Sequence, residues 1–194
     1  NYKKKSAGSF GISGCFSFHP LKNINVWGDG GIVCTNDKKF ANKISLLRNH
    51  GLINRNECKI YGYNSRLDTL QAIVAYNLIK KNLKNITKRR IFNSQYLDRK
   101  LSKLDQIKIP QRRAKNSKTV YHLYQIRVKE QKKLTNYLKS KGVDAKIHYP
   151  IPIHKQTAYI NKFKKRYNDL NITEKVSKEI ISLPVHEFVK KKNL

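Results

Sequence analysis

Acidic residues are scarce in this chain of 194 residues, where 12 Asp and Glu face 42 Lys and Arg for a formal charge of +30. Such an imbalance ordinarily indicates nucleic acid, anionic lipid or phosphorylated ligands as partners. The basic residues, however, are scattered in short clusters, without a dense basic arm or a sustained basic amphipathic helix. An AT-rich genome accounts for the abundant Lys, Asn and Ile. We therefore expect no nucleic-acid partner.

Cysteine is also scarce, and long apolar runs are missing. The three cysteines lack the spacing of metal ligands, so we expect reduced thiols, buried as apolar fillers of a cytoplasmic protein, and no metal site. Every apolar stretch is far shorter than the roughly 20 residues of a membrane span, and we expect no membrane partner. The first residues do not follow the pattern of a secretory leader, and residue 1 is not Met. We expect a piece of a longer protein.

Apolar residues make up 39 % of the chain, enough to bury a core. Residues 14–18 and 30–35 are rich in β-branched and aromatic residues and predict two neighbouring strands, with the glycines between them supplying positive φ for the reversal. A helix is predicted over 37–49, with Asp37 as a candidate N-cap and Gly51 placed to end it.

A longer helix is predicted from about residue 66 into the 90s. Ser65 and Asp68 have the spacing of a capping box, an apolar stripe follows them, and no Pro or Gly interrupts the pattern before Pro110.

The second half of the chain predicts a small α/β layer. Its expected elements are a strand over 119–128, a helix over 130–141 ended by Gly142, a strand over 143–149 and a last helix over about 173–182.

One lysine is distinguished by its setting. Lys22 follows the first predicted strand, comes just after Pro20, and precedes glycines that allow a ligand to approach the backbone. A lysine nucleophile must be uncharged for part of the time, which requires desolvation or nearby positive charge. Ser17, near the end of the strand, can offer a hydroxyl to a phosphate. The simpler alternatives are one more surface lysine and a serine that bonds only to the backbone.

Longer motifs add a resemblance to a known family. They are GSFGISGCFSFHPLKNINVWGDGGIVCTND, LLRNHG, GYNSRLDTLQA, HLYQIRV, GVDAKIHYPIPIHKQTAY and ISLPVH. In this order, and over nearly all of the chain, they resemble the C-terminal half of the DegT/DnrJ/EryC1/StrS family of pyridoxal-phosphate sugar aminotransferases. The resemblance implies an α/β fold: the C-terminal portion of a fold-type I pyridoxal-phosphate-dependent transferase. Residues 1–88 would be the remainder of the large cofactor-binding domain with its lysine loop, and residues 89–194 a small C-terminal α/β domain.

The resemblance also implies roles for five residues. Lys22 matches the lysine that binds pyridoxal 5'-phosphate as a Schiff base and, once freed, moves a proton between cofactor and substrate. Ser17 matches a hydroxyl that binds the cofactor phosphate, and Asn64 matches an asparagine that reaches this phosphate from the second subunit of a homodimer. His148 and Tyr149 match a stretch that lines the substrate entrance. The structural alternatives are a helix-start residue for Asn64, a satisfied loop histidine for His148 and a core aromatic for Tyr149.

The chain also departs from the family pattern. Members are about twice as long, and their first half supplies a phosphate loop, an aromatic residue that stacks on the cofactor ring, and the aspartate that pairs with the ring nitrogen. None of these has a match in this chain. Without that half, we expect the apolar faces of the remaining strands to be uncovered.

The resemblance implies a cytoplasmic, homodimeric aminotransferase. Its substrate would be a nucleotide-linked keto-sugar, its amino donor glutamate, and its product a building block of surface polysaccharide or lipopolysaccharide. One alternative is a catalytically inactive, truncated paralogue that serves as a structural or dimerising module. The other is a basic nucleic-acid-binding protein, which would need a concentrated basic patch with interleaved aromatics.

Overall fold

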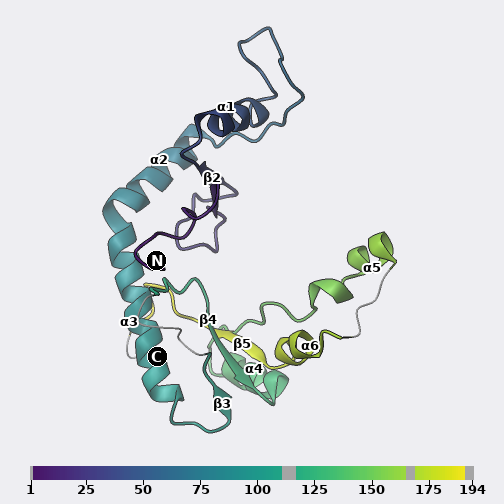
Figure 1. The fold of residues 1–194 in the computed structure, drawn as a ribbon. Helices are drawn as coiled ribbons and strands as arrows, with labels where there is room; N and C mark the ends of the chain where they lie inside the picture. The colour runs from purple at the N-terminus through teal and green to yellow at the C-terminus, as the bar shows by residue number, and fades with distance from the viewer. Residues whose placement is uncertain (1, 111–116, 165–168, 191–194) are drawn as a thin grey trace. The chain divides into compact units, whose positions relative to one another are not determined.

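Figure 1 shows the computed structural model, which describes residues 2–110, 117–164 and 169–190. The described residues divide into two units by their contacts. Unit 1 comprises Asn1–Thr87 with Arg113–Thr119, and unit 2 comprises Lys88–Arg112 with Val120–Leu194. We describe each unit by itself.

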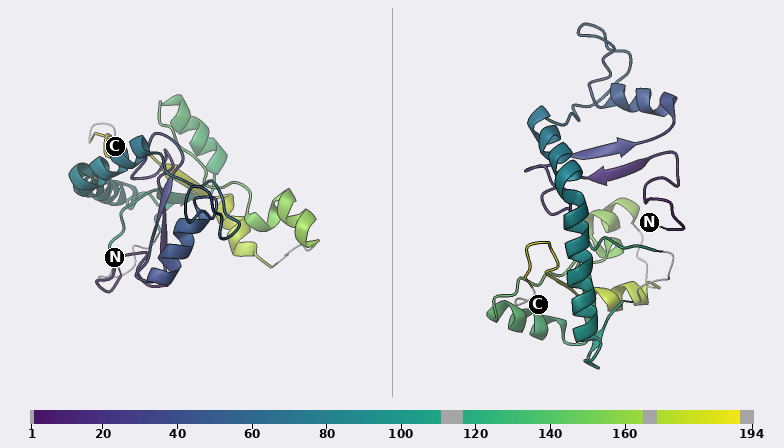
Figure 2. Two further views of the ribbon diagram at one scale, coloured as in Figure 1. Left: turned by 90° about the horizontal axis from the view of Figure 1, so that it is seen from above. Right: turned by 90° about the vertical axis from the view of Figure 1, so that its left-hand side faces the viewer.

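Two strands form the sheet of unit 1. β1 (Gly14–Ser17) pairs in an antiparallel register with β2 (Gly31–Cys34), so that Ser17 lies opposite Gly31 (Figure 2). Both predicted strands are confirmed. The turn chemistry between them differs from the prediction, because within residues 26–31 the positive φ, 61°, belongs to Trp27 and to none of the glycines.

A small core fixes the loop between these strands. Phe18, at the start of the loop, and Val26, within it, are buried, and Leu67 packs against them. Backbone hydrogen bonds join Phe18 N to Gly30 O at 2.8 Å and Val26 N to Phe18 O at 3.2 Å. Gly30 serves close packing here, since a Cβ at this position would lie 2.8 Å from Leu67 Cδ1 and 2.9 Å from Val26 Cγ2.

The sheet of unit 1 is exposed. β2 is exposed at every residue, and β1 is exposed from Cys15 onward. This confirms the expectation that the apolar faces of the strands are uncovered. The prediction that the cysteines are buried was wrong, since all three are free and exposed. No apolar layer covers Cys15 and Cys34 within the described part of unit 1.

The first helix of unit 1 has the predicted caps. α1 (Lys38–Leu47) begins after Asp37, whose Oδ1 accepts a hydrogen bond from Phe40 N at 2.9 Å. Beyond its end, Gly51 has a φ of 74° and its amide donates to Leu46 O at 2.8 Å.

The long predicted helix is confirmed, with a later start. It runs without interruption through α2 (Thr69–Asn77), the π-helical segment η1 (Leu78–Asn82) and α3 (Leu83–Leu101). Asp68 is the N-cap, and its Oδ1 accepts from Leu70 N at 2.8 Å. The predicted capping box does not form, because Ser65 lies before the helix and its amide donates to Arg48 O.

Unit 2 contains a three-stranded antiparallel sheet in the order β3–β4–β5. The strands are β3 (Ile107–Lys108), β4 (Tyr124–Val128) and β5 (Ile180–Leu183). The other elements are α4 (Gln131–Ser140), the 3-10 turn η2 (Ile153–Lys155), α5 (Thr157–Phe163) and α6 (Asn171–Ser177). The core of the unit consists of Leu97, Tyr121, Tyr124, Ile126, Val128, Ile181 and Val185.

Three predictions for this half were wrong in part. The strand expected over 119–128 forms only as β4, and Tyr121, before it, has a φ of 49°. The strand expected over 143–149 is reduced to one bridge between Lys146 and Ser182. The helix expected over 173–182 ends at Ser177, and its last five expected positions precede or enter β5.

A long-range contact ends the last helix early. The Nε2 atom of Gln131, a buried residue of α4, donates to Ser177 O at 3.0 Å and to Ile180 O at 2.6 Å. These carbonyls are therefore satisfied without a further helical turn. Ile180 and Ile181 can then join the sheet, where Ile181 is fully buried.

Candidate functional site

Lys22 lies in the loop that follows β1. Its side chain is half-buried, and its amide donates to His19 O at 2.8 Å, closing a tight turn. The buried side chains of Phe18 and Val26 hold the chain on either side of this turn. The amine is thus carried by a loop whose two ends are fixed in the core of unit 1.

Ser17 and Lys22 are linked through His19. The Ser17 hydroxyl, at the end of β1, accepts a hydrogen bond from His19 N at 3.3 Å, and His19 O accepts the bond from Lys22. His19 Nδ1 accepts from Leu21 N at 3.2 Å, so the ring supports the loop itself. The structure therefore joins two of the predicted site residues through one turn.

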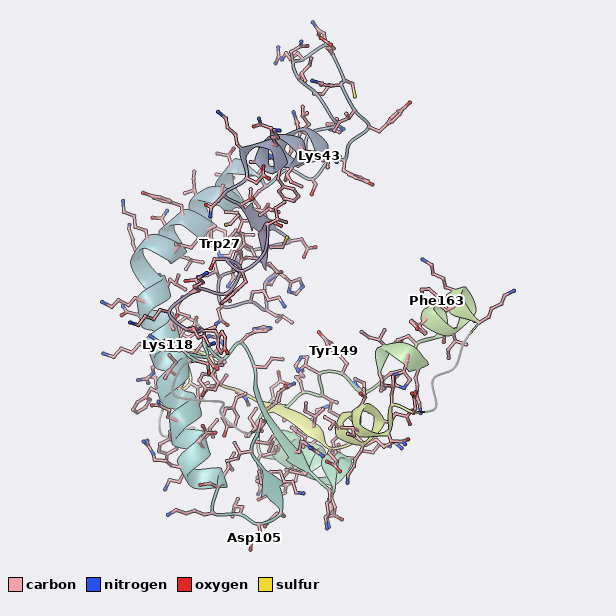
Figure 3. The ribbon with its side chains drawn as sticks, in the orientation of Figure 1. Trp27, Lys43, Asp105, Lys118, Tyr149 and Phe163 are labelled. Atoms are coloured by element: carbon pink, nitrogen blue, oxygen red, sulfur yellow. The ribbon has the colours of Figure 1, made fainter. Side chains whose placement is uncertain are left out.

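Gln71 fixes the far side of the same loop. From the third position of α2 its Nε2 donates to Val26 O at 3.3 Å and to Asp29 O at 3.2 Å. Figure 3 labels Trp27, which lies between these two acceptors in the sequence and is exposed. We did not predict this role from the sequence. A glutamine that bonds to backbone atoms more than 40 residues away leaves no local pattern.

Asn64 is exposed in the segment before α2. Its Oδ1 accepts from Arg66 Nε at 3.2 Å, and Arg66 Nη1 also reaches Asn49 Oδ1 at 3.5 Å. Because Arg66 occupies the oxygen, the amide of Asn64 presents its Nδ2 donor to other groups. Within the part of the chain that the structure describes, no hydrogen bond connects Asn64 with Lys22 or Ser17.

His148 and Tyr149 belong to unit 2. His148 Nδ1 lies 2.9 Å from Ser182 Oγ on β5, and its carbonyl accepts from Gln125 Nε2 at 3.3 Å. The two neighbouring rings are nearly perpendicular, at 86°, with centroids 5.5 Å apart. Tyr149, labelled in Figure 3, is exposed. The histidine is thus held by the sheet while the tyrosine is free to meet a ligand.

The segment after Tyr149 is attached to α6 through one carboxylate. Glu174 binds Lys155 Nζ at 2.5 Å and His154 Nε2 at 3.2 Å, and His154 is buried. The hydrogen bonds from Lys155, and then from His154, hold the pKa of Glu174 below its ordinary value. This contact fixes the extended chain that carries the predicted entrance residues.

The donor groups of unit 1 fit one end of a pyridoxal phosphate. The amine of a partly buried lysine can bind an aldehyde, and a strand-end hydroxyl, whose proton can be donated, suits a phosphate. The exposed carboxylates Asp37 and Asp68 cap helices. Among the described residues, no group of three or more His, Cys, Asp or Glu side chains is arranged to hold a metal ion. Nor is any helix in those ranges both long and apolar enough to cross a membrane.

Comparison with known proteins gives a family and a fold. The model of the DegT/DnrJ/EryC1/StrS aminotransferase family matches residues 1–194. A relative from Aneurinibacillus thermoaerophilus, named dTDP-3-amino-3,6-dideoxy-alpha-D-galactopyranose transaminase, is 34% identical over 184 residues, which are 95% of this chain and 49% of that protein.

Two solved structures agree with this match. The structure of DesV from S. venezuelae matches this chain with a TM-score of 0.90 at 30% identity. The match covers 99% of this chain and 51% of the DesV chain. NtdA from Bacillus subtilis, solved with bound cofactor PMP, matches with a TM-score of 0.84 at 25% identity. This match covers 97% of this chain and 45% of the NtdA chain. The chain spans about half the length of the curated relatives it matches. The predicted fold class, the C-terminal portion of an α/β pyridoxal-phosphate transferase, is confirmed.

Proposed function

We propose a function from one premise: the chain belongs to the DegT/DnrJ/EryC1/StrS aminotransferase family, whose members are pyridoxal-phosphate enzymes. The proposed function is that of the lysine-bearing half of an aminotransferase that acts on a nucleotide-linked keto-sugar. Three of the relatives are named as aminotransferases of dTDP- or UDP-linked sugars, which supports this substrate class. We propose glutamate as amino donor and surface polysaccharide or lipopolysaccharide as the destination of the product.

The observation that carries the proposal is the position of Lys22. Lys22 is a partly buried residue on a loop that is fixed by Phe18, Val26 and Gln71, and its backbone is joined to Ser17 through His19. Pyridoxal phosphate, when bound, supplies an aldehyde for the amine and a ring that accepts electrons from the reacting carbon. Lys22 would hold the aldehyde end and then move the proton at the reacting carbon.

The other predicted residues would bind and orient. Ser17 would donate its hydroxyl to the cofactor phosphate, while Asn64, oriented by Arg66, would donate Nδ2 to the same phosphate in a second copy of the chain. His148 and Tyr149 would contact the sugar nucleotide. This arrangement requires a homodimer with a site shared by two subunits. The free thiols are compatible with a reducing compartment, and we propose a cytoplasmic enzyme.

The two parts of the chain would divide the work. Residues 1–88 would be the remainder of the cofactor-binding domain, and residues 89–194 the small C-terminal domain. The catalytically inactive paralogue stays the second candidate. It is favoured by the exposed β1–β2 sheet, a surface that a dimerising module would cover.

A labelling experiment tests the proposal without requiring turnover. The chain is mixed with pyridoxal phosphate, its visible absorption is recorded, and borohydride is added before peptide mapping. We expect an absorbance band that Lys22→Ala removes, and a reduced label on the peptide that contains Lys22. Lys43→Ala, on exposed positions of α1, is the matched control. Label spread evenly over many lysines, with equal loss in both variants, would contradict the assignment of Lys22.

An amino-transfer assay distinguishes the two candidates. An inactive paralogue that keeps the anchor lysine would bind the cofactor but would not exchange amino groups between glutamate and a keto-sugar nucleotide. Mixing the chain with a separately produced first half of a relative would then supply the missing groups. Activity gained only in the mixture would show that this chain is the lysine-bearing half of an enzyme.

A further inference from the structure

Unit 2 contains a groove of about 730 Å³ that the proposed function does not use. This volume lies within the range of roughly 300–1,000 Å³ that is typical of small-molecule sites. The groove is formed by the loop before β3, by the ends of β3 and β4, and by the end of α6. Figure 3 labels Asp105, which lies on its rim in the turn between α3 and β3.

The groove is strongly basic. Five cationic side chains line it against two carboxylates, those of Asp105 and Glu179. The cations are Lys108, Arg127, Lys129, Lys175 and Lys178. Glu179 pairs with Arg127, whose Nε and Nη2 both donate to its Oε2 atom at 2.9 and 2.6 Å. The four lysines form no ion pair in the described ranges of the chain, so the groove keeps a net positive charge.

The register of the sheet concentrates this charge. Lys108 on β3 lies directly opposite Arg127 on β4 in the antiparallel pair. Like charges in this position repel each other, and the single carboxylate of Glu179, paired with Arg127, leaves the charges of the lysines in excess. The hydrogen bonds from Arg127, with the charges of Lys175 and Lys108, hold the pKa of Glu179 below its ordinary value, as expected in a positive field. Such a field favours an anion of high charge over a neutral ligand.

We propose that this groove binds a small ligand that carries two or more linked phosphate groups. A compact groove with four unpaired lysines suits a diphosphate, whereas a nucleic-acid backbone requires a basic stripe that continues along the surface. The lysines would donate to phosphate oxygens, and Arg127 would stay on Glu179, where it holds β4 to the chain before β5.

The total charge of the chain makes a matched control necessary. Lys175 stands in the last turn of α6 and Lys178 is its C-cap, where a basic residue also stabilises the helix dipole. In α4, Lys139 likewise stands in the last turn and Lys141 is the C-cap, and neither lines the groove. The double variants Lys175→Gln/Lys178→Gln and Lys139→Gln/Lys141→Gln therefore remove equal charge from the last turn and C-cap of two helices in one unit.

The test is calorimetric titration of the whole chain with inorganic pyrophosphate at constant, low ionic strength. We expect Lys175→Gln/Lys178→Gln to weaken binding by about tenfold, and the α4 pair by less than about twofold. If the first variant loses its circular dichroism, Lys108→Gln/Lys129→Gln replaces it with the same expectation. Equal losses in the α6 and α4 pairs, or no measurable pyrophosphate binding, would overturn the proposal.

Two further arms define the ligand and separate this inference from the proposed function. A short single-stranded oligonucleotide that binds more tightly than pyrophosphate, and loses the same factor in the groove variants, would assign the groove to nucleic acid and refute a small ligand. Lys22→Ala should leave pyrophosphate binding unchanged. A tenfold loss in Lys22→Ala would refute a groove independent of the lysine loop.

Discussion

The loop that carries Lys22 should open more often when Gln71 is replaced by Met. Methionine keeps the size and helix propensity of glutamine but removes the donor that reaches Val26 O and Asp29 O. These bonds, at 3.3 and 3.2 Å, are longer than the usual 2.9–3.0 Å, so we take the low end of the range, about 0.5 kcal/mol each. The sum, about 1 kcal/mol, corresponds to a roughly fivefold increase in loop opening.

Hydrogen exchange measures this opening directly. Peptides that cover residues 18–30 should exchange about fivefold faster in Gln71→Met, with less change in peptides of unit 2. Gln131→Met is the matched control, because this glutamine makes the equivalent pair of bonds to Ser177 O and Ile180 O at 3.0 and 2.6 Å. The shorter bonds should destabilise unit 2 more strongly and leave the Lys22 loop protected.

Pyridoxal-phosphate labelling of Lys22 gives a second measurement. Labelling should become less selective in Gln71→Met, because an opened loop no longer fixes the backbone that carries the amine of Lys22. Unchanged exchange over residues 18–30, or an equal increase in Gln131→Met, would refute the conclusion that Gln71 holds this loop.

Two further predictions concern stability. In urea unfolding, Gly30→Ala should destabilise unit 1 by about 1–3 kcal/mol, because the new Cβ would press on Leu67 and Val26. Gly11→Ala is the control and should be close to neutral, since the nearest atom to a Cβ at Gly11 is 3.9 Å away. Equal midpoints for the two variants would contradict the close packing at Gly30. Glu179 has a lowered pKa in the folded chain, so it stabilises unit 2 above the unfolded value of about 4.3, and this stability is lost as pH falls through the folded pKa. In Glu179→Gln, the urea midpoint should decline less steeply below about pH 4.3 than in the unsubstituted chain. Parallel curves of midpoint against pH for the two proteins would show that the Arg127 contact does not cause the decline.

Local chemistry explains which elements were predictable. Asp37 caps a helix through Phe40 N, three residues along, and Gly142, at a φ of 76°, ends another, so the controlling contacts lie within a few residues of sequence. The capping box at Ser65 shows the limit of this reasoning. Its spacing is correct, but the Ser65 amide bonds to Arg48 O, and Asp68 alone caps the helix. A pattern of spacing does not reveal a competing partner elsewhere in the chain.

The candidate site divides in the same way. Lys22 and Ser17 were identified from a strand-end pattern and a family motif, and the structure joins them through His19. Gln71, the orientation of Asn64 by Arg66, and the exposure of the three cysteines were not predicted. Each of these depends on a neighbour that is distant in sequence or on the layer that covers a strand.

The sequence alone determined the elements whose hydrogen bonds close within one turn, together with the motifs that identify the family. Only the tertiary structure decided where α6 ends and β5 begins, because the carbonyls at that boundary are satisfied by Gln131, 46 and 49 residues away. Only the structure, likewise, placed four lysines in one groove. Charge counted along the chain does not show which charges share a surface, since that depends on strand register and on how the helices pack.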